Sequence, residues 1–325
     1  MEIAEMRIGP VVAASGAVGF VGESYWHHRL LRPLGLDFTG STPVMKSTNL
    51  KPIAGNAPLR SNFRPREHFP RAIYADLMRG VVANAWGHSG PGLPAILASR
   101  RWQEFPEPFV ISLVSDCPES SDRLEETREM VKLLKVELPF RSPVAIEYVF
   151  SCGNVGLPTV RGLDEIHATL EILRELDVPL GVKLSIITPV SDALEIASDP
   201  NCAFLGAYNA LPDDAVLSDG RTAREVAGFV EPPLVPRVGV AGSYSGAPFF
   251  PYSLAWHRQA REAGITKPMI VGLGIMSPRD AVLAYHLVSC GGKLPTAVAI
   301  GGAMAITRPW KVRRTIHDVN GCVKR

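Results

Sequence analysis

Short apolar runs rich in β-branched residues alternate along the chain with longer stretches in which apolar residues recur at helical spacing. The helical spacing is clear at 120–136, 163–177 and 277–289. The last of these begins with Ser277 and Asp280, which fits a capping box with Asp in the place of Glu. The short apolar runs predict eight strands, at 11–15, 43–47, 109–114, 144–150, 180–186, 203–209, 268–272 and 296–301.

Strands that alternate with helices indicate a parallel sheet, and eight of them in 325 residues predict a single (β/α)8 TIM barrel. A doubly wound open sheet is the competing architecture. Two connections, at about 47–108 and 210–237, are too long to be simple turns. Long βα loops of a barrel lie at the carboxyl ends of its strands, where sites are built. No repeat or linker interrupts the chain, so we expect one domain over 1–325.

The composition is that of an ordinary globular protein, with 46% hydrophobic and 20% charged residues and a net charge of +2. This balance argues against nucleic acid or an anionic membrane as the main partner. Glu2 and Glu5 precede the first apolar run, 11–22, which is too short and too glycine-rich to cross a bilayer. We therefore predict a cytoplasmic protein. The five cysteines have no metal-ligand spacing and are expected to be reduced thiols.

Polar residues follow or end several predicted strands: Ser15, Lys46, Cys152, Asn154, Lys183 and Asn209. In a barrel these strand ends all face one mouth. A lysine on an apolar strand is costly to bury unless a negative or electron-rich group meets it, so Lys46 and Lys183 together indicate an anionic or electron-rich ligand. The alternative is that each lysine pairs with a nearby carboxylate or reaches solvent.

The end of the chain has the pattern of a phosphate site. The segments 272–280 and 299–306 each combine a strand end, a glycine turn and a helix start. The alternative is that these glycines serve the turns alone. No Walker loop is present, and 239–246 does not match the dinucleotide-binding fingerprint.

Two other polar features are expected to have no catalytic or ligand-binding role. His27 and His28 are expected on a helix after the first strand and not as metal ligands, because no third ligand lies at suitable spacing. The segment 64–71 is expected to be a solvated loop face and not an anion-binding site.

Nine segments occur in the same order as in a known family, over nearly the whole chain. They are AASG (13–16), MKSTNLKPIAGNAPLR (45–60), NAWGHSGPG (84–92), SCGNVG (151–156), VKLS (182–185), YN (208–209), GSYSGAPFFP (242–251), GLGIMSPRDA (272–281) and IGGA (300–303). With these segments the chain resembles the dihydroorotate dehydrogenase family, in its soluble class with a cysteine base.

The resemblance implies an FMN-dependent oxidoreductase in which flavin takes a hydride from one substrate carbon. Cys152 would remove a proton from the neighbouring carbon, Lys46 would touch both FMN and substrate, and Lys183 would stabilise the reduced, anionic flavin. The substrate-binding residues would be Asn84, Gly87, His88, Asn154 and Asn209. The FMN-binding residues would be Ala14, Ser15, Lys46, Ser47, Lys183, Gly242, Gly272, Gly274, Gly301 and Gly302. No metal is implied.

The chain departs from the family pattern at five positions: Val149, Gly153, Gly90, Ala210 and Leu273. Val149 and Ala210 replace hydrogen-bonding groups expected to hold a pyrimidine, and each lost contact costs roughly 1–3 kcal/mol. Trp86 and His88 could reshape the substrate pocket; alternatively, Trp86 packs and His88 faces water.

Four hypotheses follow. The protein is a dihydroorotate dehydrogenase, a family member retargeted to another carbonyl-conjugated substrate, a non-catalytic flavin-binding module, or a barrel isomerase without flavin. The expected partner is a small-molecule substrate, and a separate subunit could supply the electron acceptor, which the sequence does not identify. A homodimer is what the soluble family members suggest.

Overall fold

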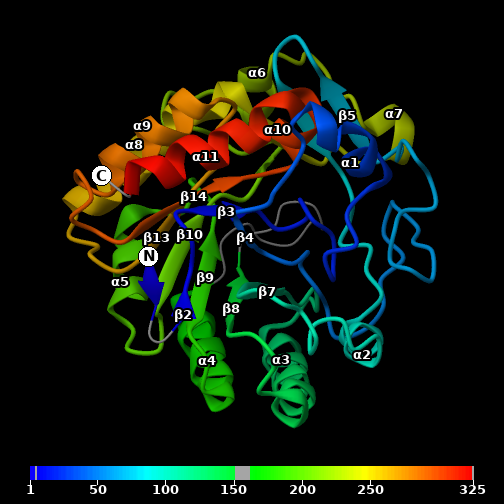
Figure 1. Cartoon of the computed structure of the whole chain (residues 1–325), viewed down its shortest axis with the longest axis vertical. Helices are drawn as coiled ribbons and strands as arrows, with labels where there is room; N and C mark the ends of the chain where they lie inside the picture. Colours follow the sequence, from blue (N-terminus) through cyan, green and yellow to red (C-terminus); the bar gives the residue numbers. More distant parts are fainter. Residues whose placement is uncertain (4–5, 151–161, 324–325) are drawn as a thin grey trace.

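The computed structural model describes residues 1–3, 6–150 and 162–323 (Figure 1). Its largest sheet has eight strands in the order β4-β3-β14-β13-β10-β9-β8-β7, and every pair in it is parallel. The strands are β3 (Val11–Ala13), β4 (Thr42–Pro43), β7 (Phe109–Leu113), β8 (Val144–Val149), β9 (Leu180–Leu184), β10 (Phe204–Ala207), β13 (Met269–Val271) and β14 (Thr296–Ile300).

The two edge strands of this sheet meet and close it. Val44, directly after β4, forms a parallel bridge with Val110 of β7, and the Met45 amide donates to the Val110 carbonyl oxygen at 2.8 Å. The predicted TIM barrel is therefore confirmed, and the doubly wound alternative is wrong. All eight predicted strands are present, although the second is a two-residue strand continued only by isolated bridges at Val44 and Thr48.

Helices surround the barrel, with α3 and α4 on one side of the strands and α8, α9 and α11 on the opposite side (Figure 1). The helices are α1 (Trp26–Leu31), α2 (Leu93–Ala98), α3 (Ser120–Glu137), α4 (Leu163–Leu173), α5 (Val190–Ser198), α6 (Ala223–Ala227), α7 (Val235–Val238), α8 (Phe250–Glu262), α9 (Pro278–Val288), α10 (Gly302–Thr307) and α11 (Val312–Val323). The predicted helices 120–136, 163–177 and 277–289 are confirmed as α3, α4 with its 3-10 extension Arg174–Leu176, and α9.

The cap of α9 differs slightly from the predicted capping box. Ser277 Oγ accepts a hydrogen bond from the Asp280 amide at 3.1 Å, as predicted. The Asp280 carboxylate reaches one residue further back and accepts from the Met276 amide at 3.2 Å.

Side chains alternate between the inside and the outside of the barrel along each strand. The inner set packs with residues of β1 (Glu2–Ile3) and β2 (Met6–Arg7), which pair antiparallel before β3. This inner cluster contains Ile3, Met6, Ile8, Val12, Val44, Val110, Ala145, Phe204, Ile270 and Ala297. The outer set packs against the helices in a second, larger cluster. The barrel is thus filled by side chains near the amino ends of its strands.

The two long connections are more than simple turns, as expected, but they contain short strands that the sequence did not predict. They contribute to a four-stranded antiparallel sheet in the order β11-β12-β6-β5. Its strands are β5 (Ile73–Asp76), β6 (Val81–Asn84), β11 (Leu211–Pro212) and β12 (Ser243–Gly246). Strands of two to four residues are too short to show a periodic pattern, so only the tertiary pairing defines them.

No helix in the described part of the chain combines the length and the apolar character that a bilayer crossing requires.

Candidate active site

A cavity of about 840 Å³ lies at the carboxyl ends of the barrel strands. Its size is within the range of small-molecule and cofactor sites, about 300–1,000 Å³. It brings together most of the residues predicted from sequence: Ala14, Ser15, Lys46, Ser47, Asn84, His88, Lys183, Asn209, Gly274, Gly301 and Gly302 all line it. The segment with Cys152 and Asn154 lies outside the described residues; Val149, at the end of β8, lines the cavity.

Three glycines assigned to substrate or FMN by the resemblance do not line the cavity: Gly87, Gly242 and Gly272. A Cβ on Gly242 would lie 2.6 Å from the Asn84 carbonyl oxygen, and one on Gly272 would lie 2.5 Å from the Tyr208 Cβ. The structure therefore gives these two glycines a packing role. Glycine at position 242 lets β6 and β12 approach each other, and glycine at 272 makes room for Tyr208 inside the barrel.

The glycine turn after β14 is different, because it faces open space. A Cβ on Gly302, the first residue of α10, would meet no atom within 4 Å. A Cβ on Gly301 would meet only the Ala14 side chain, at 3.4 Å. The backbone here can be approached closely by a ligand atom. After β13, Leu273 has φ of 68°, so this turn keeps a left-handed conformation while carrying a side chain.

A chain of hydrogen-bonded hydroxyl groups leads from the lining of the cavity into the barrel. Ser15 Oγ lies 3.1 Å from Ser47 Oγ, which lies 3.0 Å from Ser112 Oγ. Ser112 Oγ in turn donates to Glu147 Oε1 at 3.0 Å. Ser112 and Glu147 lie on β7 and β8, while Ser15 and Ser47 lie in the segments that follow β3 and β4. Hydrogen bonds therefore tie four strands together at the floor of the cavity.

Glu147 is fully buried and is the centre of this floor. Lys183 Nζ lies 3.4 Å from Glu147 Oε1, and the Tyr208 hydroxyl donates to Glu147 Oε2. The Lys183 ammonium also lies 4.4 Å from the centre of the Tyr208 ring. Burial, followed by the charge of Glu147, raises the pKa of Tyr208 well above its ordinary value, so this phenol stays protonated. The carboxylate pairing considered for Lys183 from sequence is thus confirmed, and Lys183 lines the cavity as well.

Glu147 was missed in the sequence analysis. The available signal was a single charged residue inside an otherwise apolar strand, Val144–Val149. A carboxylate on such a strand needs a partner, and Lys183 is the matching cation on the neighbouring strand β9. Only the register between the two strands shows that these residues meet.

Lys46 lies among aromatic rings, with its Nζ 4.8 Å from the centre of the Trp86 ring and 5.7 Å from that of Phe20. Cation–π contacts of this kind hold an ammonium without neutralising its charge. Trp86 is 6% exposed, so its ring packs in the interior, which is the alternative that the sequence analysis gave for this residue. The Asn84 Oδ1 accepts from the Trp86 amide at 2.9 Å, so this oxygen stabilises the turn after β6.

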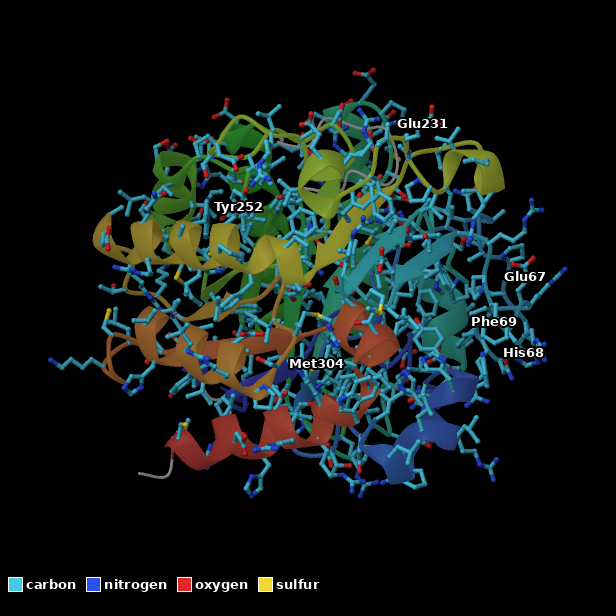
Figure 2. All side chains as sticks on the ribbon, turned by 90° about the horizontal axis from the view of Figure 1, so that it is seen from above. Glu67, His68, Phe69, Glu231, Tyr252 and Met304 are labelled. Carbon is cyan, nitrogen blue, oxygen red and sulfur yellow. The ribbon has the colours of Figure 1, made fainter. Side chains whose placement is uncertain are left out.

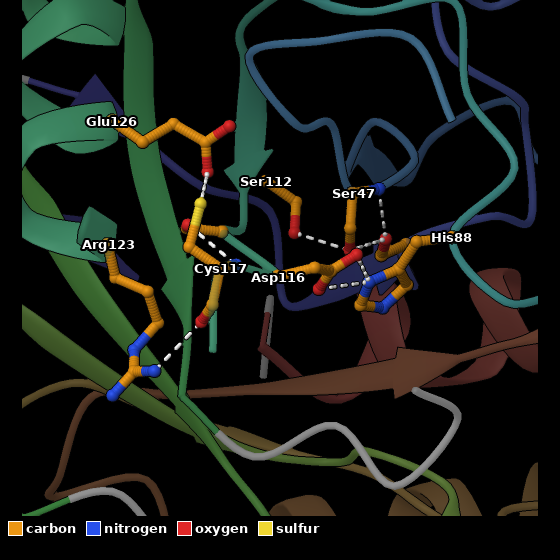
Figure 3. Close-up of polar contacts among 9 residues, drawn as sticks. Ser47, His88, Ser112, Asp116, Cys117, Arg123 and Glu126 are labelled. Carbon is orange, nitrogen blue, oxygen red and sulfur yellow. Dashed lines mark hydrogen bonds and ion pairs between the residues drawn. The ribbon is translucent and has the colours of Figure 1, made fainter. Parts of the chain in front are cut away.

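His88 is buried, so the alternative that its side chain faces water is wrong. Its Nδ1 lies 2.8 Å from both carboxylate oxygens of Asp116, a residue that follows β7 (Figure 3). Asp116 was not singled out from sequence, because no motif joins it to a histidine 28 residues earlier.

The rim of the cavity is aromatic and basic. On one side, Trp26 lies 5.3 Å from Phe69 between ring centres, and its Nε1 donates to the His68 carbonyl oxygen at 2.7 Å. Phe69 is 80% exposed, and Figure 2 shows it at the outer edge of the molecule beside Glu67 and His68. The segment 64–71 is therefore largely exposed, as predicted, but it also borders the cavity, which the sequence did not indicate.

His27 and His28 lie on α1, as predicted, and both line the cavity. Burial lowers the pKa of His28 to about 3, with a further contribution from His27. Among the described residues, no group of three or more His, Cys, Asp or Glu side chains is placed to hold a metal ion.

The charge of the lining favours an anionic ligand. The described lining contains one carboxylate, that of Glu67. It contains the lysine or arginine side chains of Lys46, Arg60, Arg64 and Arg237, besides Lys183, whose charge is paired by Glu147.

No protein-family model and no curated protein matches the sequence. Among solved structures, the chain is similar to thiamine phosphate pyrophosphorylase from Pyrococcus furiosus, with 13% identity and a TM-score of 0.27 over 66% of this chain and 82% of that one. It is also similar to β-methylaspartase from Clostridium tetanomorphum in a magnesium complex, with 13% identity and a TM-score of 0.42 over 99% of this chain and 60% of that one. Likenesses this weak say nothing of substrate or cofactor, and the barrel itself is defined by the strand order above.

Proposed function

We propose that the protein is an FMN-dependent oxidoreductase of the dihydroorotate dehydrogenase type, which transfers hydride between a substrate C–C bond and flavin. The observation that supports this most strongly is the convergence of Lys46, Asn84, Lys183 and Asn209 on one cavity. These residues lie on four separate segments, and the resemblance assigns each of them to cofactor or substrate. A chance resemblance in short motifs would not require them to share a cavity.

The residues present fit FMN. Its phosphate needs a backbone that it can approach, and the open turn at Gly301 and Gly302 offers one. Its ring and its negative charge need a cavity of adequate size with positive potential, and both are present. Ala14, Ser15 and Ser47 line the same cavity and would complete the contacts.

When bound, FMN would supply a two-electron acceptor for hydride. The protein would bind and orient the substrate beside it. Lys46 would hold a negative group of the substrate, while Asn84 and Asn209 would hydrogen-bond its polar edge. Lys183, fixed by Glu147, would present a positive charge at the cavity floor. Cys152 as proton acceptor stays a prediction from the resemblance.

Two apolar residues favour a retargeted substrate as the second candidate. Val149 and Ala210 both line the cavity where the resembled family would offer hydrogen-bonding groups to a pyrimidine. A small anion with a carbonyl-conjugated bond, but with fewer hydrogen-bonding groups than a pyrimidine, would suit this lining better. We assign no electron acceptor; a separate subunit could supply it.

The test is an anaerobic absorbance titration of the purified protein with dihydroorotate, following the oxidised flavin band. We expect FMN to bind and the band to bleach. A cysteine base requires the bleaching rate to fall by about 100-fold or more in Cys152→Ala. The double variant Lys183→Met with Glu147→Gln, which leaves no buried charge unpaired, should weaken FMN binding. The exposed Lys293→Met should not change it.

Each outcome has a meaning. A yellow protein that bleaches only with another carbonyl-conjugated substrate supports the retargeted candidate. A protein that binds FMN but turns over nothing would be a flavin-binding module. A colourless protein that cannot be reconstituted with FMN would overturn the proposal.

A further inference from the structure

The His88–Asp116 pair has the geometry of an acid–base dyad. Both carboxylate oxygens of Asp116 lie 2.8 Å from His88 Nδ1, and the two side chains are 9% and 17% exposed. A carboxylate at this distance holds Nδ1 as the protonated nitrogen, so that proton exchange with a ligand falls to Nε2. His88 is among the residues that line the cavity, so the pair lies at the proposed site.

Asp116 is held in place through the residue that follows it. Asp116 precedes Cys117, whose carbonyl oxygen accepts from Arg123 Nη1 of α3 at 2.8 Å (Figure 3). Arg123 Nη2 is itself 2.6 Å from Glu165 Oε2. The position of Asp116 therefore depends on a buried ion pair outside the cavity.

The backbone at His88 is in a conformation that L-residues rarely adopt, with φ of 52°. Such a conformation costs about 1 kcal/mol or more and persists where the surroundings enforce it, often at functional sites. Gly87 before it has φ of 66°, so two consecutive residues turn the chain and direct His88 toward Asp116.

We propose that His88, positioned by Asp116, exchanges a proton with a carbon acid in this cavity. The substrate class is a small anion with a C–H group beside a carbonyl, its charge held by Lys46. The proposal requires the cavity to be the active site, as argued above, but it does not require flavin. It gives His88 the proton-accepting role that the resemblance gives to Cys152.

The step is balanced without a co-reactant. Neutral His88 Nε2 takes the proton from the substrate carbon, and the electron pair of the broken C–H bond stays on the substrate as an enolate. The resulting imidazolium is stabilised by the Asp116 carboxylate. Return of a solvent-derived proton from Nε2 to the same carbon completes an exchange that can be measured.

The experiment measures deuterium incorporation from D2O by mass spectrometry. The probes are dihydroorotate and 2-oxoglutarate, two anions with a C–H group beside a carbonyl, and 5,6-dihydrouracil, which lacks the carboxylate. We expect exchange on at least one anion and slower exchange on 5,6-dihydrouracil. The rate should fall by about 100-fold or more in His88→Asn. Asparagine tolerates positive φ and can still donate to Asp116, so this variant should remain folded.

Asp116→Asn tests positioning. It should lower exchange by about tenfold or more. The ¹⁵N shifts of the His88 ring, assigned by comparison with His88→Asn, should show Nδ1 protonated in the wild type and a changed tautomer in Asp116→Asn. The matched control is His317→Asn, since His317 pairs with Asp318 at 3.2 Å on the exposed face of α11; it should leave exchange unchanged.

Failure of this inference is distinguishable from failure of the proposed function. Exchange that survives His88→Asn but disappears in Cys152→Ala would overturn the dyad and support the cysteine base. Exchange on neither anion, or an Nδ1 that is not protonated in the wild type, would also overturn it. A colourless protein that exchanges deuterium through His88 would overturn only the flavin assignment.

Discussion

Glu147 places a fully buried carboxylate at the cavity floor. Its contacts are Ser112, Tyr208 and Lys183. A buried ion pair adds little net stability, but removing one partner leaves the other charge without compensation. Glu147 and Lys183 should therefore tolerate joint replacement far better than single replacement.

We expect Glu147→Gln to lower the free energy of unfolding by about 3–5 kcal/mol, because the Lys183 ammonium then lacks its counter-charge. The double variant with Lys183→Met should recover a large part of this loss. Urea unfolding followed by circular dichroism measures both.

The control is Glu129→Gln, which removes the partner of Lys132 from an exposed pair on α3. This change should cost less than about 1 kcal/mol. Equal costs for Glu147→Gln and Glu129→Gln would show that the buried pair does not hold the lysine charge.

At the scale of elements, the antiparallel sheet β11-β12-β6-β5 is what joins the two long connections over the barrel mouth. It positions Asn84 of β6 and Ser245 of β12 at the cavity. Gly246 ends β12 with φ of 125°, and a Cβ there would collide with the Gly80 carbonyl oxygen. The close approach of β6 and β12 therefore depends on a missing side chain.

We expect Gly246→Ala to lower the free energy of unfolding by about 3 kcal/mol, from a strained φ and a backbone collision together. Gly239→Ala is the matched control, because φ is 79° there and a Cβ would meet no atom within 4 Å. It should cost only about 1 kcal/mol. Hydrogen exchange should also increase at β6 and β12 amides in Gly246→Ala; unchanged protection in both strands would contradict this role.

At the scale of the whole molecule, buried neutral histidines make stability depend on pH. His257 of α8 is fully buried, with Nδ1 2.7 Å from the Ser253 carbonyl oxygen. Burial lowers its pKa from 6.5 to about 4. Above pH 6.5 neither the folded nor the unfolded state is protonated at this group, so it contributes no pH dependence there. As the pH falls below 6.5, only the unfolded state takes up the proton, and the folded state is disfavoured.

We therefore expect the free energy of unfolding to fall between about pH 6.5 and 4, with His257 contributing about 3 kcal/mol of the loss at pH 4. His28, whose pKa is about 3, acts in the same direction. Chemical denaturation at a series of pH values measures the slope. His257→Gln should flatten it, and the exposed His317→Gln should not. A slope that His257→Gln leaves intact would show that other groups carry the acid sensitivity.

The sequence by itself determined the eight strands, the principal helices and the set of polar residues at the strand ends. It could do so because helical spacing and short apolar runs are local patterns, and because parallel strands bring their carboxyl ends together wherever they pair. Lys46, Lys183 and Asn209 could thus be placed at one mouth before their distances were known.

Tertiary structure alone decided barrel closure, the small sheet and the partners of the charged groups. Val44 meets Val110, Lys183 meets Glu147, and His88 meets Asp116 across separations of 28 to 66 residues. No local pattern records such distant pairings, because they depend on strand register and on how the long connections fold back. The physical reason is that a buried charge selects its partner by proximity in space, which the chain order does not specify.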